Sequence, residues 1–181
     1  MSAPQLRPMA ARNESSFLAP WSLGCAFRRA LIAVLLTALP SPSLADKVRI
    51  SNLADVNFGS VTNLQAEARR SQSICVYSNG ASHDYSVTAT GSGVGGSFAL
   101  SNGSYSLPFD AEWSSSAGQS TGTKLVSNIA LVGQVSAAGN QTCGSGPTSS
   151  ASLSIVLRAA DLSTATEGSY SGSLTLLIAA Q

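Results

Sequence analysis

Two cysteines are the residues of this chain best suited to defined chemistry. Cys75 and Cys143 remain as a pair once Cys25, which lies in the leader described below, is set aside. An even number of cysteines in an exported chain favours a disulfide. Two thiols and the distant His83 cannot complete a closed zinc shell. We therefore predict a Cys75–Cys143 disulfide, no metal site and no cofactor.

The titratable side chains form no catalytic constellation. His83 precedes Asp84, but neighbours on a strand point to opposite faces, so the two are not a preset dyad. Asp110 and Glu112 would share a face, and paired carboxylates can serve glycoside hydrolysis. Two acids so spaced are more typical of a solvent-exposed strand face. We expect no G-x-S-x-G, H-E-x-x-H, P-loop or Rossmann motif, and we expect a protein that is not an enzyme.

The composition narrows the function classes further. The chain has 181 residues, 10% charged residues, 44% hydrophobic residues and a net charge of +1, whereas an ordinary soluble domain has about 25% charged residues. No basic excess is present to neutralise phosphates, so we expect no nucleic-acid partner. Disordered chains have low hydrophobicity and high net charge, and this chain has neither, so disorder is disfavoured.

The first 45 residues have the pattern of a secretory signal. Arg28-Arg29 precede an apolar run over 30–39, and small residues at Ser43 and Ala45 suit cleavage after Ala45. The run is too short to span a bilayer, so no membrane span is expected after cleavage. The arginine pair also fits twin-arginine export. The expected organisation is a signal peptide over 1–45 and one exported domain over 46–181.

Two-residue alternation, which indicates short half-buried strands, recurs through 46–181. Such runs cover 48–58, 74–76, 85–89, 98–100, 109–113, 129–135, 153–157 and 174–180. Asn102-Gly103 is a hairpin signal because both residues tolerate positive φ. No helical period appears. Short strands with frequent turns predict an all-β sandwich.

The last predicted strand, over 174–180, is strongly apolar and carries no charge. Natural edge strands are usually shortened, charged or covered, because an open apolar edge templates aggregation. Either this strand lies inside a sheet, or another chain completes the fold.

Several segments resemble, in order, those of the spore coat protein U domain family, which includes subunits of archaic chaperone–usher pili. The segments are Asn57-Phe58-Gly59 with the preceding Val56, the Cys75 strand, the Tyr85-Ser86-Val87 strand, Leu100–Gly103, and Gly168-Ser169-Tyr170 running into the last strand. The resemblance extends over nearly the whole of 46–181.

The resemblance implies an incomplete immunoglobulin-like sandwich that lacks its final strand. A periplasmic chaperone, and then a neighbouring pilus subunit, would insert a strand along a groove lined by Leu174, Leu176 and Ile178. It implies a structural pilus subunit, assembled through an outer-membrane usher and supporting adhesion or biofilm formation. Such a protein passes through the periplasm to the cell surface.

The sequence departs from that family at the start of the domain. Polymerising members usually have an N-terminal donor strand and an additional cysteine, and neither is evident after residue 45. Val48 and Ile50 either donate a strand or belong to the domain's own first strand. Shaft, minor and tip positions therefore stay open.

A different class of function is a self-contained carbohydrate- or surface-binding module. It would use exposed aromatic side chains such as Tyr105 or Trp113. The same residues are more typical of a hydrophobic core.

Overall fold

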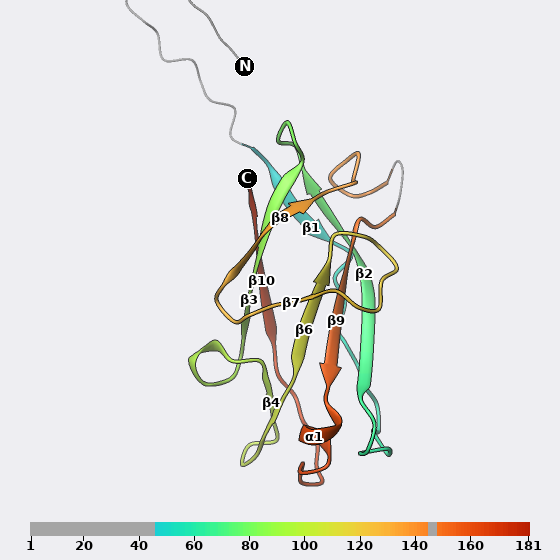
Figure 1. The fold of residues 1–181 in the computed structure, drawn as a ribbon, viewed down its shortest axis with the longest axis vertical. Helices are drawn as coiled ribbons and strands as arrows, with labels where there is room; N and C mark the ends of the chain where they lie inside the picture. Colours follow the sequence, from blue (N-terminus) through green and yellow to red (C-terminus); the bar gives the residue numbers. More distant parts are fainter. Residues whose placement is uncertain (1–45, 145–147) are drawn as a thin grey trace, which may run out of the picture. The chain divides into compact units, whose positions relative to one another are not determined.

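The computed structural model describes residues 46–144 and 148–181. The predicted signal sequence over 1–45 lies outside the described residues. In chain order the elements are β1 (Val48–Ser51), β2 (Ala68–Ser78), β3 (Asp84–Gly91), a 3-10 turn (Val94–Gly96), β4 (Ala99–Ser101), β5 (Ser106–Pro108), β6 (Asp110–Ser114), β7 (Thr123–Lys124), β8 (Ala130–Val135), β9 (Ala151–Leu157), α1 (Ala159–Leu162) and β10 (Leu174–Ala180) (Figure 1). Within these ranges no helix has the length and apolarity needed to cross a membrane.

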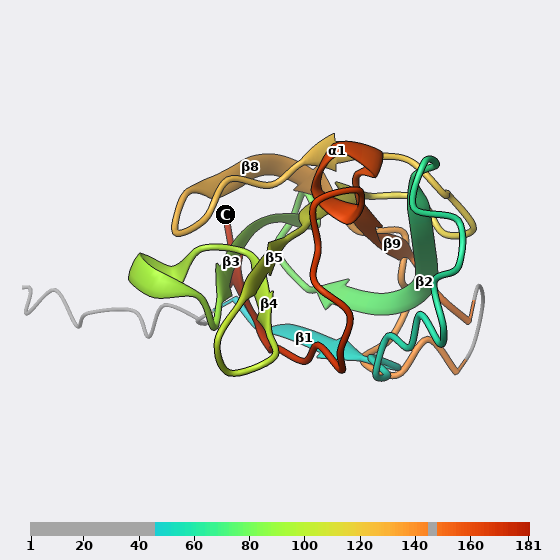
Figure 2. The same ribbon diagram turned by 90° about the horizontal axis from the view of Figure 1, so that it is seen from below.

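The strands form two main antiparallel sheets. The five-stranded sheet has the order β1-β2-β9-β6-β7, and the three-stranded sheet has the order β10-β3-β8. β4 and β5 form a separate hairpin, and the view in Figure 2 shows it beneath the two sheets. The all-β architecture predicted from the alternation is confirmed.

One hydrophobic core lies between the two sheets. Trp113 and Ile74 contribute to it from the five-stranded sheet, and Tyr85 and Val87 contribute from the three-stranded sheet. Trp113 is 1% exposed and Tyr85 is 0% exposed. Because apolar side chains of both sheets fill one interior, the fold is a β-sandwich.

β9 is buried on both of its faces, although the alternation predicted burial on one. Its outward side chains Ser152 and Ser154 lie under the loop 115–122. Ser152 Oγ donates to Ser116 O at 2.9 Å, and Ser154 Oγ donates to Ser120 O at 3.0 Å. Hydroxyls therefore help to fasten this loop over the sheet, together with Arg69, whose Nη1 donates to Ser120 O at 2.8 Å, and Glu112, whose Oε2 accepts from Gly122 N at 3.2 Å.

The strand predicted over 48–58 is wrong in its second half, since β1 ends at Ser51. Asn52 has φ 63°, a left-handed conformation that breaks a strand and that asparagine tolerates. Its Nδ2 donates to Thr148 O at 3.2 Å. Val56 and Phe58 still pack against the core, so their apolar spacing reflected burial rather than strand pairing.

The other predicted strands are present with altered bounds. β3, β6, β9 and β10 match their runs, while β2 is longer and β8 begins one residue after the exposed Ile129. The Asn102-Gly103 turn joins β4 to β5, and Gly103 has φ 93°. The alternation did not indicate β5, β7 or α1, which are too short to show a period.

Candidate functional site

β10 is an edge strand whose inner side chains are incompletely covered. It pairs with β3, from Leu174 opposite Gly91 to Ala180 opposite Tyr85, and with no other strand of the described ranges. Leu174, Leu176 and Ile178 pack against the core yet are half-buried. The explanation in which the apolar strand is enclosed within a sheet is therefore wrong.

The backbone of β10 uses only half of its hydrogen-bonding groups. Ser92 N donates to Ser173 O at 3.0 Å, and Gln181 N donates to Asp84 O at 3.2 Å. In an antiparallel ladder, alternate residues bond to the same neighbour. The odd-numbered residues of β10 thus face β3, while Leu174, Leu176 and Ile178 direct their N–H and C=O groups to the open edge.

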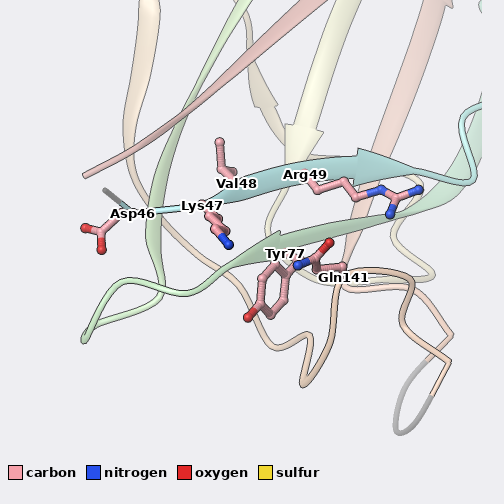
Figure 3. Close-up of a pocket in the computed structure, with 6 residues that line it drawn as sticks. All are labelled: Asp46, Lys47, Val48, Arg49, Tyr77 and Gln141. Carbon is pink, nitrogen blue, oxygen red and sulfur yellow. The ribbon is translucent and has the colours of Figure 1, made fainter. Parts of the chain in front are cut away.

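β1 presents the same arrangement on the other sheet. Asn79 N donates to Lys47 O at 3.1 Å, so odd-numbered residues of β1 bond to β2. Val48 and Ile50 have inward, half-buried side chains and backbone groups that face away from β2. Lys47 and Arg49 carry their side chains on the outer face, as the close-up in Figure 3 shows.

The two open edges face each other. β1 and β10 are in contact and lie next to one another in both views (Figures 1 and 2), but no ladder joins them. We call this line of contact the β1–β10 seam, formed by Val48, Ile50, Leu174, Leu176 and Ile178. The alternation predicted the β10 side of the seam. For Val48 and Ile50 the sequence left two alternatives open, a donor strand or the first strand of the domain, and β1 is paired with β2 of its own domain.

The segment Asn57-Phe58-Gly59 forms a tight turn in the chain between β1 and β2. Gly59 N donates to Asn57 Oδ1 at 2.7 Å, and Gly59 has φ 63°. Phe58 packs against the core, with the Arg70 guanidinium carbon 5.9 Å from its ring centroid. These residues therefore anchor the irregular chain that follows β1.

Gly168 and Tyr170 belong to the approach to β10. Tyr170 Oη donates to Thr166 O at 3.0 Å, and its ring packs against the core. A Cβ at Gly168 would lie 3.0 Å from Asn102 Nδ2. This segment therefore packs closely on the β4–β5 hairpin just before β10 begins. Its role is to support the start of β10, and it is not part of the seam.

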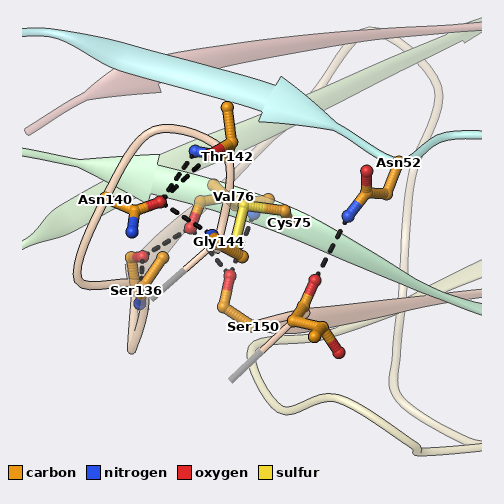
Figure 4. Close-up of a disulfide and its surroundings, with 11 residues drawn as sticks. Asn52, Cys75, Val76, Ser136, Asn140, Thr142, Gly144 and Ser150 are labelled. Carbon is orange, nitrogen blue, oxygen red and sulfur yellow. Dashed lines mark hydrogen bonds between the residues drawn. A yellow bond between two sulfur atoms is a disulfide. The ribbon is translucent and has the colours of Figure 1, made fainter. Parts of the chain in front are cut away.

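The predicted disulfide is present. Cys75 of β2 is bonded to Cys143, with Cα atoms 5.9 Å apart, and Figure 4 shows the bond. Its sulfurs are buried with Ala138 in a small cluster, against which Tyr77 packs. The bond fastens the loop 136–144 to the outer face of β2.

Asp110 and Glu112 are engaged in ion pairs. Partial burial raises the pKa of Asp110, but hydrogen bonds and charge from Arg158 and Lys124 outweigh burial and the pKa is lowered. The hydrogen bond from Arg69, 2.6 Å from Nη1 to Oε2, lowers the pKa of Glu112. Both carboxylates are thus held by cations of the same sheet, as is typical of ion pairs on a solvent-exposed strand face. No group of residues suited to a metal ion is found in the described ranges.

The expectation that no Rossmann or G-x-S-x-G pattern occurs is wrong by letter, because two glycine-rich segments match these motifs. Gly91–Gly96 reads G-x-G-x-x-G, and Gly118–Gly122 reads G-x-S-x-G. Both motifs require a strand followed by a helix. The first segment instead leads from β3 through a three-residue 3-10 turn, and the second is the loop between β6 and β7. Neither segment has the geometry of its motif.

His83, Trp113 and Tyr105 have structural settings that differ from one another. His83 lies in the β2–β3 turn, with Nδ1 2.7 Å from Ser78 O. Trp113 lies in the core, as expected for its residue type. The alternative prediction, in which Trp113 is exposed for ligand binding, is wrong. Tyr105 is 55% exposed, so the expectation that it belongs to the core is also wrong.

No family model matches the chain, and no curated protein matches it. A solved structure described as a chaperone–tip adhesin complex vital for CFA/I fimbriae biogenesis matches 76% of this chain and 42% of that chain, with 16% identity and a TM-score of 0.47. The chain thus spans less than half the length of that neighbour. The resemblance to the spore coat protein U domain family stays a prediction.

Proposed function

We propose that this protein is an exported structural subunit of a surface pilus whose fold is completed by a strand from another protein. The strand would insert along β10 at the β1–β10 seam. The observation that supports this is the pair of facing edges, on which the same residues offer both unpaired backbone groups and half-buried apolar side chains.

Strand addition explains features that an isolated domain would not need. An added strand gains main-chain hydrogen bonds from one edge, and its alternate side chains fill pockets between the sheets. Leu176 and Ile178 would supply one wall of those pockets, and Ile50 the other. The absence of charge along 174–180 is unusual for an edge strand. A bound strand would cover this apolar edge.

The partners follow from this mode of assembly and from the sequence resemblance. A periplasmic chaperone would supply the first strand, an outer-membrane usher would receive the complex, and a neighbouring subunit would replace the chaperone. Adhesion or biofilm formation would be the role of the assembled fibre. β1 is paired with β2 over its whole length, so Val48 and Ile50 are accounted for without a donor role.

A donor-strand fusion tests the proposal. A hairpin extension after Gln181 with alternating Val and Thr would run antiparallel to β10. It should raise the free energy of unfolding by about 3 kcal/mol, because complete burial of an apolar side chain contributes about 1.5–3 kcal/mol. A control extension with the same residues in block order should give little gain. Equal stability of both fusions would count against strand addition.

Two variants on one strand sharpen the test. Leu176→Asn alters a seam side chain, whereas Leu177→Asn alters its neighbour, which is 64% exposed on the opposite face. In the alternating fusion, Leu176→Asn should remove most of the added stability and Leu177→Asn should leave it. If the two variants behave alike, the seam is not the site of insertion.

The alternative of a self-contained carbohydrate- or surface-binding module now rests on Tyr105. This side chain is exposed on the β4–β5 turn beside a cavity of about 240 Å³. Glycan binding by an uncomplemented monomer, abolished by Tyr105→Ala, would favour this function over the first.

A further inference from the structure

A second surface feature lies along β1 and β2 and shares one residue, Val48, with the seam. It is a cavity of about 440 Å³ (Figure 3), a volume within the range of small-molecule sites. Its lining residues are Asp46, Lys47, Val48, Arg49, Tyr77 and Gln141. Neither the strand-addition function nor the core uses most of these side chains.

Two cations of this cavity have no carboxylate partner within the described ranges. Lys47 and Arg49 share one face of β1, and Arg49 lies opposite Tyr77 in the ladder with β2. The other basic residues of these ranges are engaged: Arg69, Lys124 and Arg158 in ion pairs, and Arg70 over the Phe58 ring. The cavity is therefore lined by two cationic side chains for which the described residues provide no ion pair.

The wall opposite the cations is held in place by covalent and hydrogen bonds. Tyr77 packs on the Cys75–Cys143 cluster, and Gln141 lies on the loop which that disulfide fastens. Asn140 Oδ1 accepts hydrogen bonds from Thr142 N at 3.1 Å and from Gly144 N at 2.9 Å, as Figure 4 shows. Gln141 therefore lies in a turn that these hydrogen bonds hold in place, so this wall of the cavity is preformed.

We infer that this cavity binds a small sugar acid. The carboxylate of the ligand would lie with Lys47 and Arg49, because charge-assisted hydrogen bonds to carboxylates are the strong ones. The Tyr77 ring offers an apolar face for a sugar ring, and the Gln141 amide can both donate to and accept from hydroxyls. Asp46, at the rim, opposes the anion and limits its affinity.

Titration of the protein produced from the full-length gene in an oxidising compartment tests this inference. The probes are glucuronate, glucose with the same ring but no charge, and inorganic phosphate with charge but no ring. Glucuronate should bind saturably and shift the amide resonances of Lys47, Arg49 and Tyr77. Glucose should bind at least about tenfold more weakly, since it lacks the charged hydrogen bond, which contributes about 1.5–3 kcal/mol. Phosphate should also bind more weakly than glucuronate, because it has no ring to pack on Tyr77 and no hydroxyls for Gln141. Equal binding of glucose or phosphate, or no binding of glucuronate, would overturn the inference.

Substitutions separate this site from the seam. Arg49→Gln should weaken glucuronate binding about tenfold, and Asp46→Asn should strengthen it by about twofold to threefold, as expected for removal of an exposed like charge. Arg70→Gln, which removes a cation elsewhere on the protein, should have no effect. Leu176→Asn should also leave binding unchanged, so failure of strand addition and failure of this inference give different results. Weaker binding in Asp46→Asn would contradict the assigned polarity of the cavity.

Discussion

Trp113 of β6 donates its indole N–H to the hydroxyl of Tyr85 on β3, at 3.2 Å. The two rings also meet edge to face, with centroids 6.3 Å apart and planes 75° apart. β6 belongs to the five-stranded sheet and β3 to the three-stranded sheet, so this contact joins the two layers. Tyr85 also lies opposite Ala180 of β10, so one partner of the contact belongs to the strand that pairs with the open-edged strand.

Tyr85→Phe should destabilise the fold by about 1–3 kcal/mol, because it leaves the buried Trp113 N–H without its acceptor. Urea unfolding followed by tryptophan fluorescence measures the change. Tyr105→Phe is the matched control, since Tyr105 is 55% exposed, and it should change the free energy of unfolding by less than about 0.5 kcal/mol. Equal effects of the two variants would refute the structural role of the contact.

Replacement of both Cys75 and Cys143 by Ala should lower the free energy of unfolding by about 4 kcal/mol. The bond closes a loop with a sequence separation of 68, and release of such a loop increases the entropy of the unfolded chain by that order. Unfolding of the oxidised protein with and without reductant gives an independent measure. Reductant should not alter the double variant; a response there would point to another cause.

Stability should fall as the medium is made acidic below about pH 4, the region in which free carboxyl groups titrate. The pKa values of Asp110 and Glu112 are lowered in the folded protein by their cationic partners. A lowered folded-state pKa contributes stability that is present above the unfolded-state pKa and lost as pH falls through the folded-state pKa. Urea midpoints at pH 7 and pH 3 measure the loss.

Glu112→Gln should reduce that difference between pH 7 and pH 3, because the amide cannot titrate. Arg69 is 23% exposed and Glu112 is 18% exposed, so solvent screens the pair and the contribution is modest, on the order of 1 kcal/mol. An unchanged pH dependence in this variant would assign the acid sensitivity to other carboxylates.

Gly172→Ala should destabilise the approach to β10 by about 1–3 kcal/mol, the range for overpacking. An added Cβ would lie 2.8 Å from Ala99 O and 3.1 Å from Leu100 Cδ2, where backbone limits relaxation. Ser171→Ala is the control, because the hydrogen bonds of Ser171 with Ser101 use backbone atoms. Thermal unfolding distinguishes the variants, and a stable Gly172→Ala protein would show that β4 can move away.

The alternation of residues determined much of the fold. Period-two spacing identified β3, β6, β9 and β10, and it assigned Leu174, Leu176 and Ile178 to one face, because side chains alternate across a strand. The same spacing was misleading at Val56 and Phe58, where an apolar pattern continued after Asn52 had ended β1. Burial favours such a pattern whether or not the backbone is paired.

Which strands become neighbours was decided by the tertiary structure. Sequence period assigns a face to each side chain but does not state whether an edge is occupied, since pairing is made between distant segments. Only the fold places β10 at an edge, opposes it with β1 and leaves Val48 and Ile50 on the other side of the seam. Likewise, only the fold brings Gln141 beside Lys47, because a disulfide between two distant cysteines carries its loop to the outer face of β2.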